Sequence, residues 1–73
     1  MKTIEKCKEQ EQFFLNEMGY TTISESNEVG YYLMSKVDKE FGDIQLIEIN
    51  KDWENPKHIL MSKEEFNKIA EML

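Results

Sequence analysis

Apolar residues at the start of the chain recur at helical spacing and end at a glycine. A helix with 3.6 residues per turn places on one face Ile4, Cys7, Phe14, Leu15 and Met18. Thr3 can act as the N-cap residue, and Gly19 can take the left-handed conformation that often ends a helix. The first twenty residues are therefore predicted to form a helix that ends near Met18.

The middle of the chain consists of short segments rich in β-branched and aromatic residues, separated by turn residues. This pattern predicts four strands, at residues 20–25, 29–38, 43–50 and 57–61. Because the connections are short, neighbouring strands are expected to pair antiparallel as a meander.

Two of these strands indicate how the sheet is covered. In the second strand Tyr32 and Met34 point to one face, and the larger apolar set that includes Leu33 points to the other. The apolar residues of the third strand do not alternate cleanly, since Leu46 and Ile47 are adjacent. Either a bulge shifts this strand or both of its faces are partly covered.

The last residues carry a capping box, with Ser62 as the N-cap and Glu65 three residues later. The helix that follows has one apolar stripe, which consists of Phe66, Ile69, Ala70 and Leu73. The chain is thus predicted to be a single α+β domain over residues 1–73, in the order α-β-β-β-β-α. Both helices are expected to pack on one face of the four-stranded antiparallel sheet. The other face is then expected to expose Tyr32 and Met34 to a partner or to a second copy.

The charge of the chain is acidic and unevenly distributed. Fifteen acidic residues and nine lysines give a net charge of −6, and there is no arginine. Residues 21–56 alone carry three lysines and eight acids, a net charge of −5. Nucleic acid is therefore an unfavourable partner, since its binding needs a basic face. The acid either keeps the protein soluble or forms a face for a basic protein.

The residues that enzymes and metal sites use are scarce. Cys7 and His58 are the only cysteine and histidine, and the glycines are isolated from one another. Asp38, Glu40 and Asp43 surround one predicted turn, where a loosely held calcium ion is the alternative to an ordinary acidic surface loop. We expect no enzymatic activity, no metal and no cofactor. One cysteine, no run of about 20 apolar residues and no signal-like start favour a cytoplasmic protein.

Trp53, the only tryptophan, lies between two acids in the polar loop before the fourth strand. It either folds back over the core or serves as an interface anchor. The candidate partner-binding residues are Tyr32, Met34, Glu40, Asp43, Asp52, Trp53 and Glu54. The leading hypothesis is a non-enzymatic inhibitor of phage or mobile-element type, which mimics DNA and occupies a basic protein surface.

Residues 57–73 carry one resemblance to a known family. The run from His58 to Phe66, followed by Ile69 and Leu73, resembles the last strand and helix of the transcriptional coactivator family positive cofactor four. The resemblance implies a homodimer whose curved antiparallel sheet binds single-stranded DNA and whose C-terminal helix lies at the dimer interface. In that alternative Tyr31, Tyr32 and Trp53 are the candidates for stacking on bases. The predicted N-terminal helix and the acidic strands differ from that family.

Overall fold

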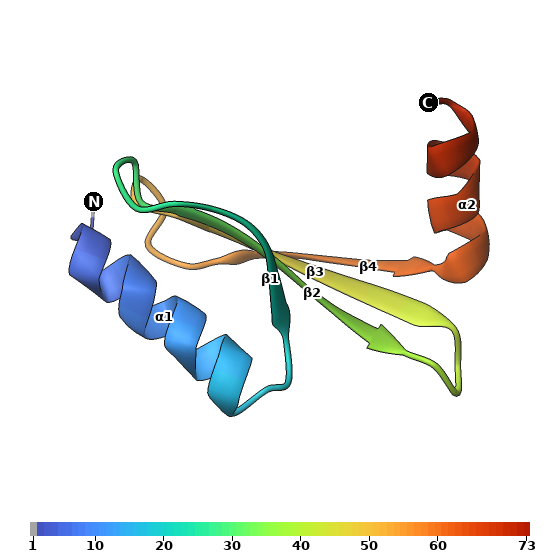
Figure 1. The fold of residues 1–73 in the computed structure, drawn as a ribbon, viewed down its shortest axis with the longest axis horizontal. Helices are drawn as coiled ribbons and strands as arrows, with labels where there is room; N and C mark the ends of the chain where they lie inside the picture. The colour runs from blue at the N-terminus through green and yellow to red at the C-terminus, as the bar shows by residue number, and fades with distance from the viewer. Residues whose placement is uncertain (1) are drawn as a thin grey trace.

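The computed structural model describes residues 2–73, which form two helices and one four-stranded sheet (Figure 1). In chain order the elements are α1 (Ile4–Asn16), β1 (Thr21–Ser26), β2 (Tyr31–Asp38), β3 (Asp43–Asn50), β4 (Lys57–Ser62) and α2 (Lys63–Glu71). Each strand pairs antiparallel with the next, so the order in the sheet is β1-β2-β3-β4. The predicted α+β class, element order and meander are confirmed.

Helix α1 begins as predicted and ends two residues early. The Thr3 hydroxyl accepts a hydrogen bond from the backbone N–H of Lys6 at 3.1 Å. The helix ends at Asn16, and the backbone N–H of Tyr20 donates to the carbonyl of Phe14 at 3.0 Å. This earlier end lets the chain reverse through Gly19, at φ +75°, and brings the ring of Tyr20 into the core.

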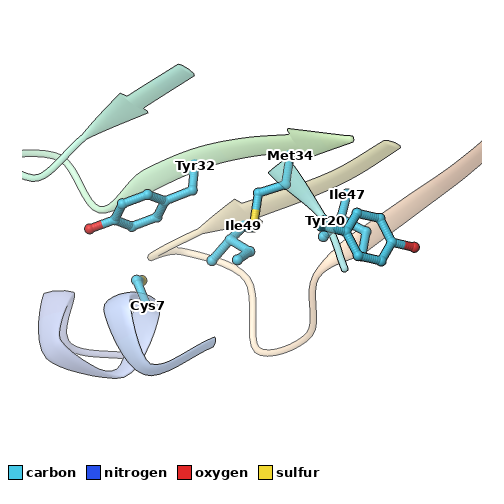
Figure 2. Packing of buried hydrophobic residues seen from close by; sticks show 6 residues of the cluster. All are labelled: Cys7, Tyr20, Tyr32, Met34, Ile47 and Ile49. Atoms are coloured by element: carbon cyan, nitrogen blue, oxygen red, sulfur yellow. The ribbon is translucent and has the colours of Figure 1, made fainter. Parts of the chain in front are cut away.

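The core lies between α1 and one face of the sheet. Its buried apolar side chains are Cys7, Tyr20, Tyr32, Met34, Ile47 and Ile49 (Figure 2). The strand register explains the set, because Tyr32 lies opposite Ile49 and Met34 lies opposite Ile47. All four side chains therefore share the face that α1 covers.

Tyr32 and Met34 were expected on the exposed face, and this prediction is wrong because both side chains are 0% exposed. Alternation separates two faces but does not say which of them a helix covers. Of the two alternatives for the third strand, the bulge near Leu46 is absent, since the β2–β3 register is continuous, and both faces of β3 are partly covered. The register shift lies instead in β1, between Thr22 and Ser24.

Polar groups complete the packing under α1. Glu11 is buried, and its Oε2 accepts a hydrogen bond from the Thr22 hydroxyl at 2.7 Å. The Tyr20 hydroxyl donates to Gln45 Oε1 at 2.8 Å, and the Tyr32 hydroxyl donates to Asn27 Oδ1 at 2.7 Å. The Glu11–Thr22 bond joins α1 to β1, and the Tyr20–Gln45 bond joins the α1–β1 connection to β3. Directional hydrogen bonds as well as apolar contacts therefore fix how α1 lies on the sheet.

Helix α2 does not pack on the face that α1 covers. Its capping box forms as predicted, because Ser62 Oγ accepts from the Glu65 N–H at 3.1 Å and Glu65 Oε1 accepts from the Ser62 N–H at 2.8 Å. However, α2 has no buried residue, and it stands at the end of β4 on the side of the sheet opposite α1 (Figure 1). The expectation that both helices pack on one face therefore holds for α1 only.

A candidate protein-binding surface

The sheet face opposite α1, which we call the open face, is largely aliphatic. The register places on it Tyr31, Leu33, Ser35 and Val37 of β2, Ile44, Leu46 and Glu48 of β3, and Lys57, Ile59 and Met61 of β4. Val37 and Ile59 are 55% and 53% exposed, and Leu33, Ile44, Leu46 and Met61 are half-buried. Within residues 2–73, α2 reaches this face only beside Val37 and Ile44, and the rest of the face has no covering helix.

The apolar stripe of α2 continues this face around a corner. Phe66 lines a surface hollow together with Val37 and Ile44, which places the base of the stripe against the open face. Ile69 follows on the same side of α2 and is 50% exposed, and Leu73, two residues beyond the end of the helix, is 105% exposed. We call the open face together with Phe66, Ile69 and Leu73 the inner surface. It is an apolar corner, of which the sheet face forms one arm and the apolar stripe of α2 forms the other.

Charged groups are few on the open face, and contacts within the chain occupy them. The Tyr31 hydroxyl donates to Glu48 Oε2 at 2.6 Å, and this hydrogen bond is the main reason that the pKa of Tyr31 is raised. Lys57 lies opposite Glu48 in the register, and its Nζ sits 3.8 Å from the centre of the Trp53 ring. Because Glu48 and Lys57 carry opposite charges, the open face is close to neutral in a chain whose net charge is −6.

The acidic residues of the predicted site do not gather in one place. Glu40 and Asp43 lie at the β2–β3 hairpin, whereas Asp52 and Glu54 lie in the β3–β4 loop at the other end of β3. Strand β3, which has eight residues and begins at Asp43, runs from one group to the other over roughly 25 Å. The structure thus gives two acidic ends instead of one acidic face.

Several polar side chains near these acids shape the loops. Asp38 Oδ1 accepts hydrogen bonds from the backbone N–H groups of Glu40 and Phe41, at 3.0 and 3.2 Å. Asn50 Oδ1 accepts from the N–H of Asp52 at 2.9 Å. Trp53 is half-buried under the Lys57 ammonium, so its ring is partly withdrawn from any partner. The Asp38 carboxylate therefore stabilises the β2–β3 turn through these two hydrogen bonds.

The structure keeps the two nucleophile and base candidates in different environments. The Cys7 side chain is fully buried in the core, while His58 is exposed and packs edge-on against the Phe14 ring at 6.1 Å between centroids. Within residues 2–73, no three His, Cys, Asp or Glu side chains are placed to hold a metal ion together. Nor does this part of the chain contain a helix that is long and apolar enough to cross a membrane.

Comparisons with protein-family models, curated proteins and solved structures found no match to this chain. The inner surface itself is therefore the basis for the functional argument.

Sequence reasoning placed the exposed apolar residues on the wrong face, although one signal pointed to the right answer. The apolar residues of β3 do not alternate because Ile44 and Leu46 face one way and Ile47 and Ile49 the other. Such a strand needs a cover on both faces.

Proposed function

We propose that this protein is a non-enzymatic protein-binding domain and that the inner surface is where it binds. The supporting observation is the continuous apolar corner, in which Val37, Ile59 and Ile69 are all at least half exposed. A monomer seldom leaves a contiguous apolar patch of this kind uncovered unless it is a binding site. Water is released from such a surface when a partner covers it, and this release is the main driving force of association.

The short length of α2 and its uncovered apolar side chains support the same proposal. Nine residues are too few for a stable isolated helix in water, and most helices gain their stability from packing one apolar side. In α2 the side chains that should pack, Phe66 and Ile69, are about half exposed. A partner against this stripe supplies the contacts that the chain itself does not.

A narrower proposal concerns charge. The acidic ends, with Glu40 and Asp43 on one side and Asp52 and Glu54 on the other, favour a basic protein as an additional partner. An inhibitor of phage or mobile-element type that occupies a basic surface fits this charge. A location in the cytoplasm fits the free thiol of Cys7, because thiols stay reduced there. Binding through the acidic ends should weaken steeply as salt rises.

Binding of single-stranded nucleic acid has less support. The open face offers a single lysine, Lys57, and its ammonium already lies over the Trp53 ring. Among the stacking candidates, Tyr32 is buried and the Tyr31 hydroxyl is bonded to Glu48. A positively charged groove lined with free aromatic rings is what such binding uses.

The test is photocrosslinking from one position on the inner surface and one matched position elsewhere. A benzophenone amino acid replaces Ile59 in one variant and Phe13 in the other; these side chains are 53% and 52% exposed, and Phe13 lies on α1. In cells that express the full chain, irradiation should attach protein to position 59 and little to position 13. Absence of any protein adduct at position 59, or equal capture at both positions, would contradict the proposal.

A further inference from the structure

The size of the exposed surface indicates how large the missing contact is. The chain exposes 5486 Å², whereas a folded monomer of 8.7 kDa is expected to expose about 4700 Å². Its radius of gyration is 13.1 Å, compared with about 11 Å for a compact domain of this length. The excess surface is about 750 Å², close to the roughly 800 Å² that each partner buries in a standard protein–protein interface.

The shape of the inner surface suits a copy of itself. One part is a twisted sheet face and the other is a projecting helix (Figure 1). A two-fold rotation can bring the helix of each molecule onto the sheet of the other. The same residues are then used on both sides, so the contact closes and leaves no second apolar arm uncovered. A single partner helix or a single partner sheet covers only one arm of the corner.

Charge favours the same occupant. Two chains of net charge −6 repel each other unless their contact avoids acidic groups. On the open face the only acid is Glu48, which is hydrogen-bonded to Tyr31 and lies opposite Lys57. Contact through this face leaves the acidic ends, at Glu40 and Asp52, in solvent. The same near-neutrality offers little to a basic protein, which needs acidic groups in the contact.

Resting on the proposed function, we propose that the occupant of the inner surface is a second copy of this chain. In the resulting homodimer, α2 of each copy lies across the open face of the other. Phe66, Ile69 and Leu73 then pack against Leu46 and Ile59 of the partner subunit. The dimer carries twice the net charge of one chain, and the open face contributes to the interface only the opposite charges of Glu48 and Lys57.

The first test is the mass of the purified full chain by sedimentation equilibrium, over about 1 to 200 µM. The expected result is a mass of twice 8.7 kDa that falls toward 8.7 kDa on dilution. Ile59→Lys and Ile69→Glu should each weaken dimerisation by about a hundredfold or more, because symmetry buries each unpaired charge twice. Phe13→Glu, at a matched exposure on α1, should leave the dimer unchanged. Far-ultraviolet circular dichroism checks that each variant is folded.

A second measurement tests the arrangement of the two copies. Chains with the benzophenone at position 59 are mixed with ¹⁵N-labelled wild-type chains, irradiated and digested. Mass spectrometry should find crosslinks between position 59 of the unlabelled chain and α2, residues 63–71, of the labelled one. A mass that stays at 8.7 kDa at every concentration overturns the homodimer, as does a crosslinked pair that joins other elements. If the chain is a monomer but position 59 captures a different protein in cells, the protein-binding proposal stands and only the identity of the occupant is wrong.

Discussion

The two faces of the sheet carry similar apolar residues and have opposite environments. Ile47 and Ile49 of β3 are fully buried under α1, while Ile44 and Leu46 of the same strand face the side that α1 leaves open. Both faces also hold polar residues, Gln45 and Lys36 on the covered face and Ser35 and Glu48 on the open one. Hydrophobicity alone therefore does not decide which face becomes the interior.

On the covered face, side-chain hydrogen bonds join the sheet to α1 and to the α1–β1 connection. Glu11 bonds to Thr22, and Tyr20 bonds to Gln45, so polar side chains help to fix α1 in one position. The open face has aliphatic side chains, and within residues 2–73 most of it has no covering helix to fix. Helix α1 thus buries the part of the covered face around Ile47 and Ile49, while Leu60 at its β4 edge stays 68% exposed.

The largest expected contrast is between two adjacent residues of β3. Ile47→Ala should lower the free energy of unfolding by about 2–5 kcal/mol, because it leaves a cavity among fully buried side chains. Leu46→Ala, on the half-buried open face, should cost much less in dilute protein. Urea denaturation at low micromolar concentration measures both. Equal losses would mean that the two faces are equally packed within one chain.

The same strand shows what the sequence could and could not predict. Local signals predicted the element order, the antiparallel pairing and the capping box at Ser62, because each depends on neighbours along the chain. Alternation also separated the side chains of β2 correctly into two sets. Choosing the set that α1 covers depends on contacts between distant parts of the chain, and here the less apolar set is buried.

The candidate site was harder to predict for the same reason. Glu40 and Asp52 are close in sequence and acidic, yet β3 holds them at opposite ends of the sheet. The stripe containing Phe66 and Ile69 was identified, but its amphipathic pattern is typical of a helix that packs within its own domain. The pattern is the same when the covering surface belongs to another molecule.

The next contrast concerns the hydrogen bond between Thr22 and the buried Glu11 of α1. Thr22→Val removes the hydroxyl that donates to the buried Glu11 carboxylate, at a cost of about 1–3 kcal/mol. Thr21→Val, at the adjacent exposed position, should change the free energy of unfolding by less than about 0.5 kcal/mol. Thermal unfolding of the three proteins makes the comparison. A Thr21 variant as unstable as the Thr22 variant would show that the Glu11 contact contributes little.

A smaller effect is expected at α2, which depends on its cap because little else holds it. Ser62→Ala should destabilise the helix by about 1 kcal/mol. It should reduce the ellipticity at 222 nm in dilute protein, while the urea midpoint of the sheet changes little. The neighbouring Ser62 backbone N–H, and then the Ser62 hydroxyl, hold the pKa of Glu65 below its ordinary value.

This pKa provides a second measurement on the same cap. A lowered pKa means that the Glu65 contribution is present above the unfolded pKa and is lost as the pH falls through the folded pKa. In Ser62→Ala the pKa of Glu65, followed by NMR of its carboxyl carbon, should rise part of the way to the ordinary value. Because the backbone donor remains, a complete return would assign the whole effect to the hydroxyl.

The smallest expected effect concerns the pKa values of three tyrosines, which are raised for different reasons on the two faces of the sheet. Burial is the main reason that the pKa values of Tyr20 and Tyr32 are raised, whereas the hydrogen bond to Glu48 is the main cause for Tyr31. For all three the neutral phenol is favoured by folding. Their contribution is therefore complete below the unfolded pKa of about 10 and is lost as the pH rises through the folded values.

Replacement of Glu48 by Gln separates these causes. The substitution keeps an acceptor for the Tyr31 hydroxyl and removes the negative charge beside it, so the pKa of Tyr31 should fall. The pKa values of Tyr20 and Tyr32, on the other side of the sheet, should stay unchanged. Alkaline titration followed by ¹³C NMR of the tyrosine ring carbons resolves the three groups. A parallel fall in all three values would mean that the sheet does not isolate its two faces electrostatically. In that case the near-neutrality of the open face would no longer follow from its own few charges.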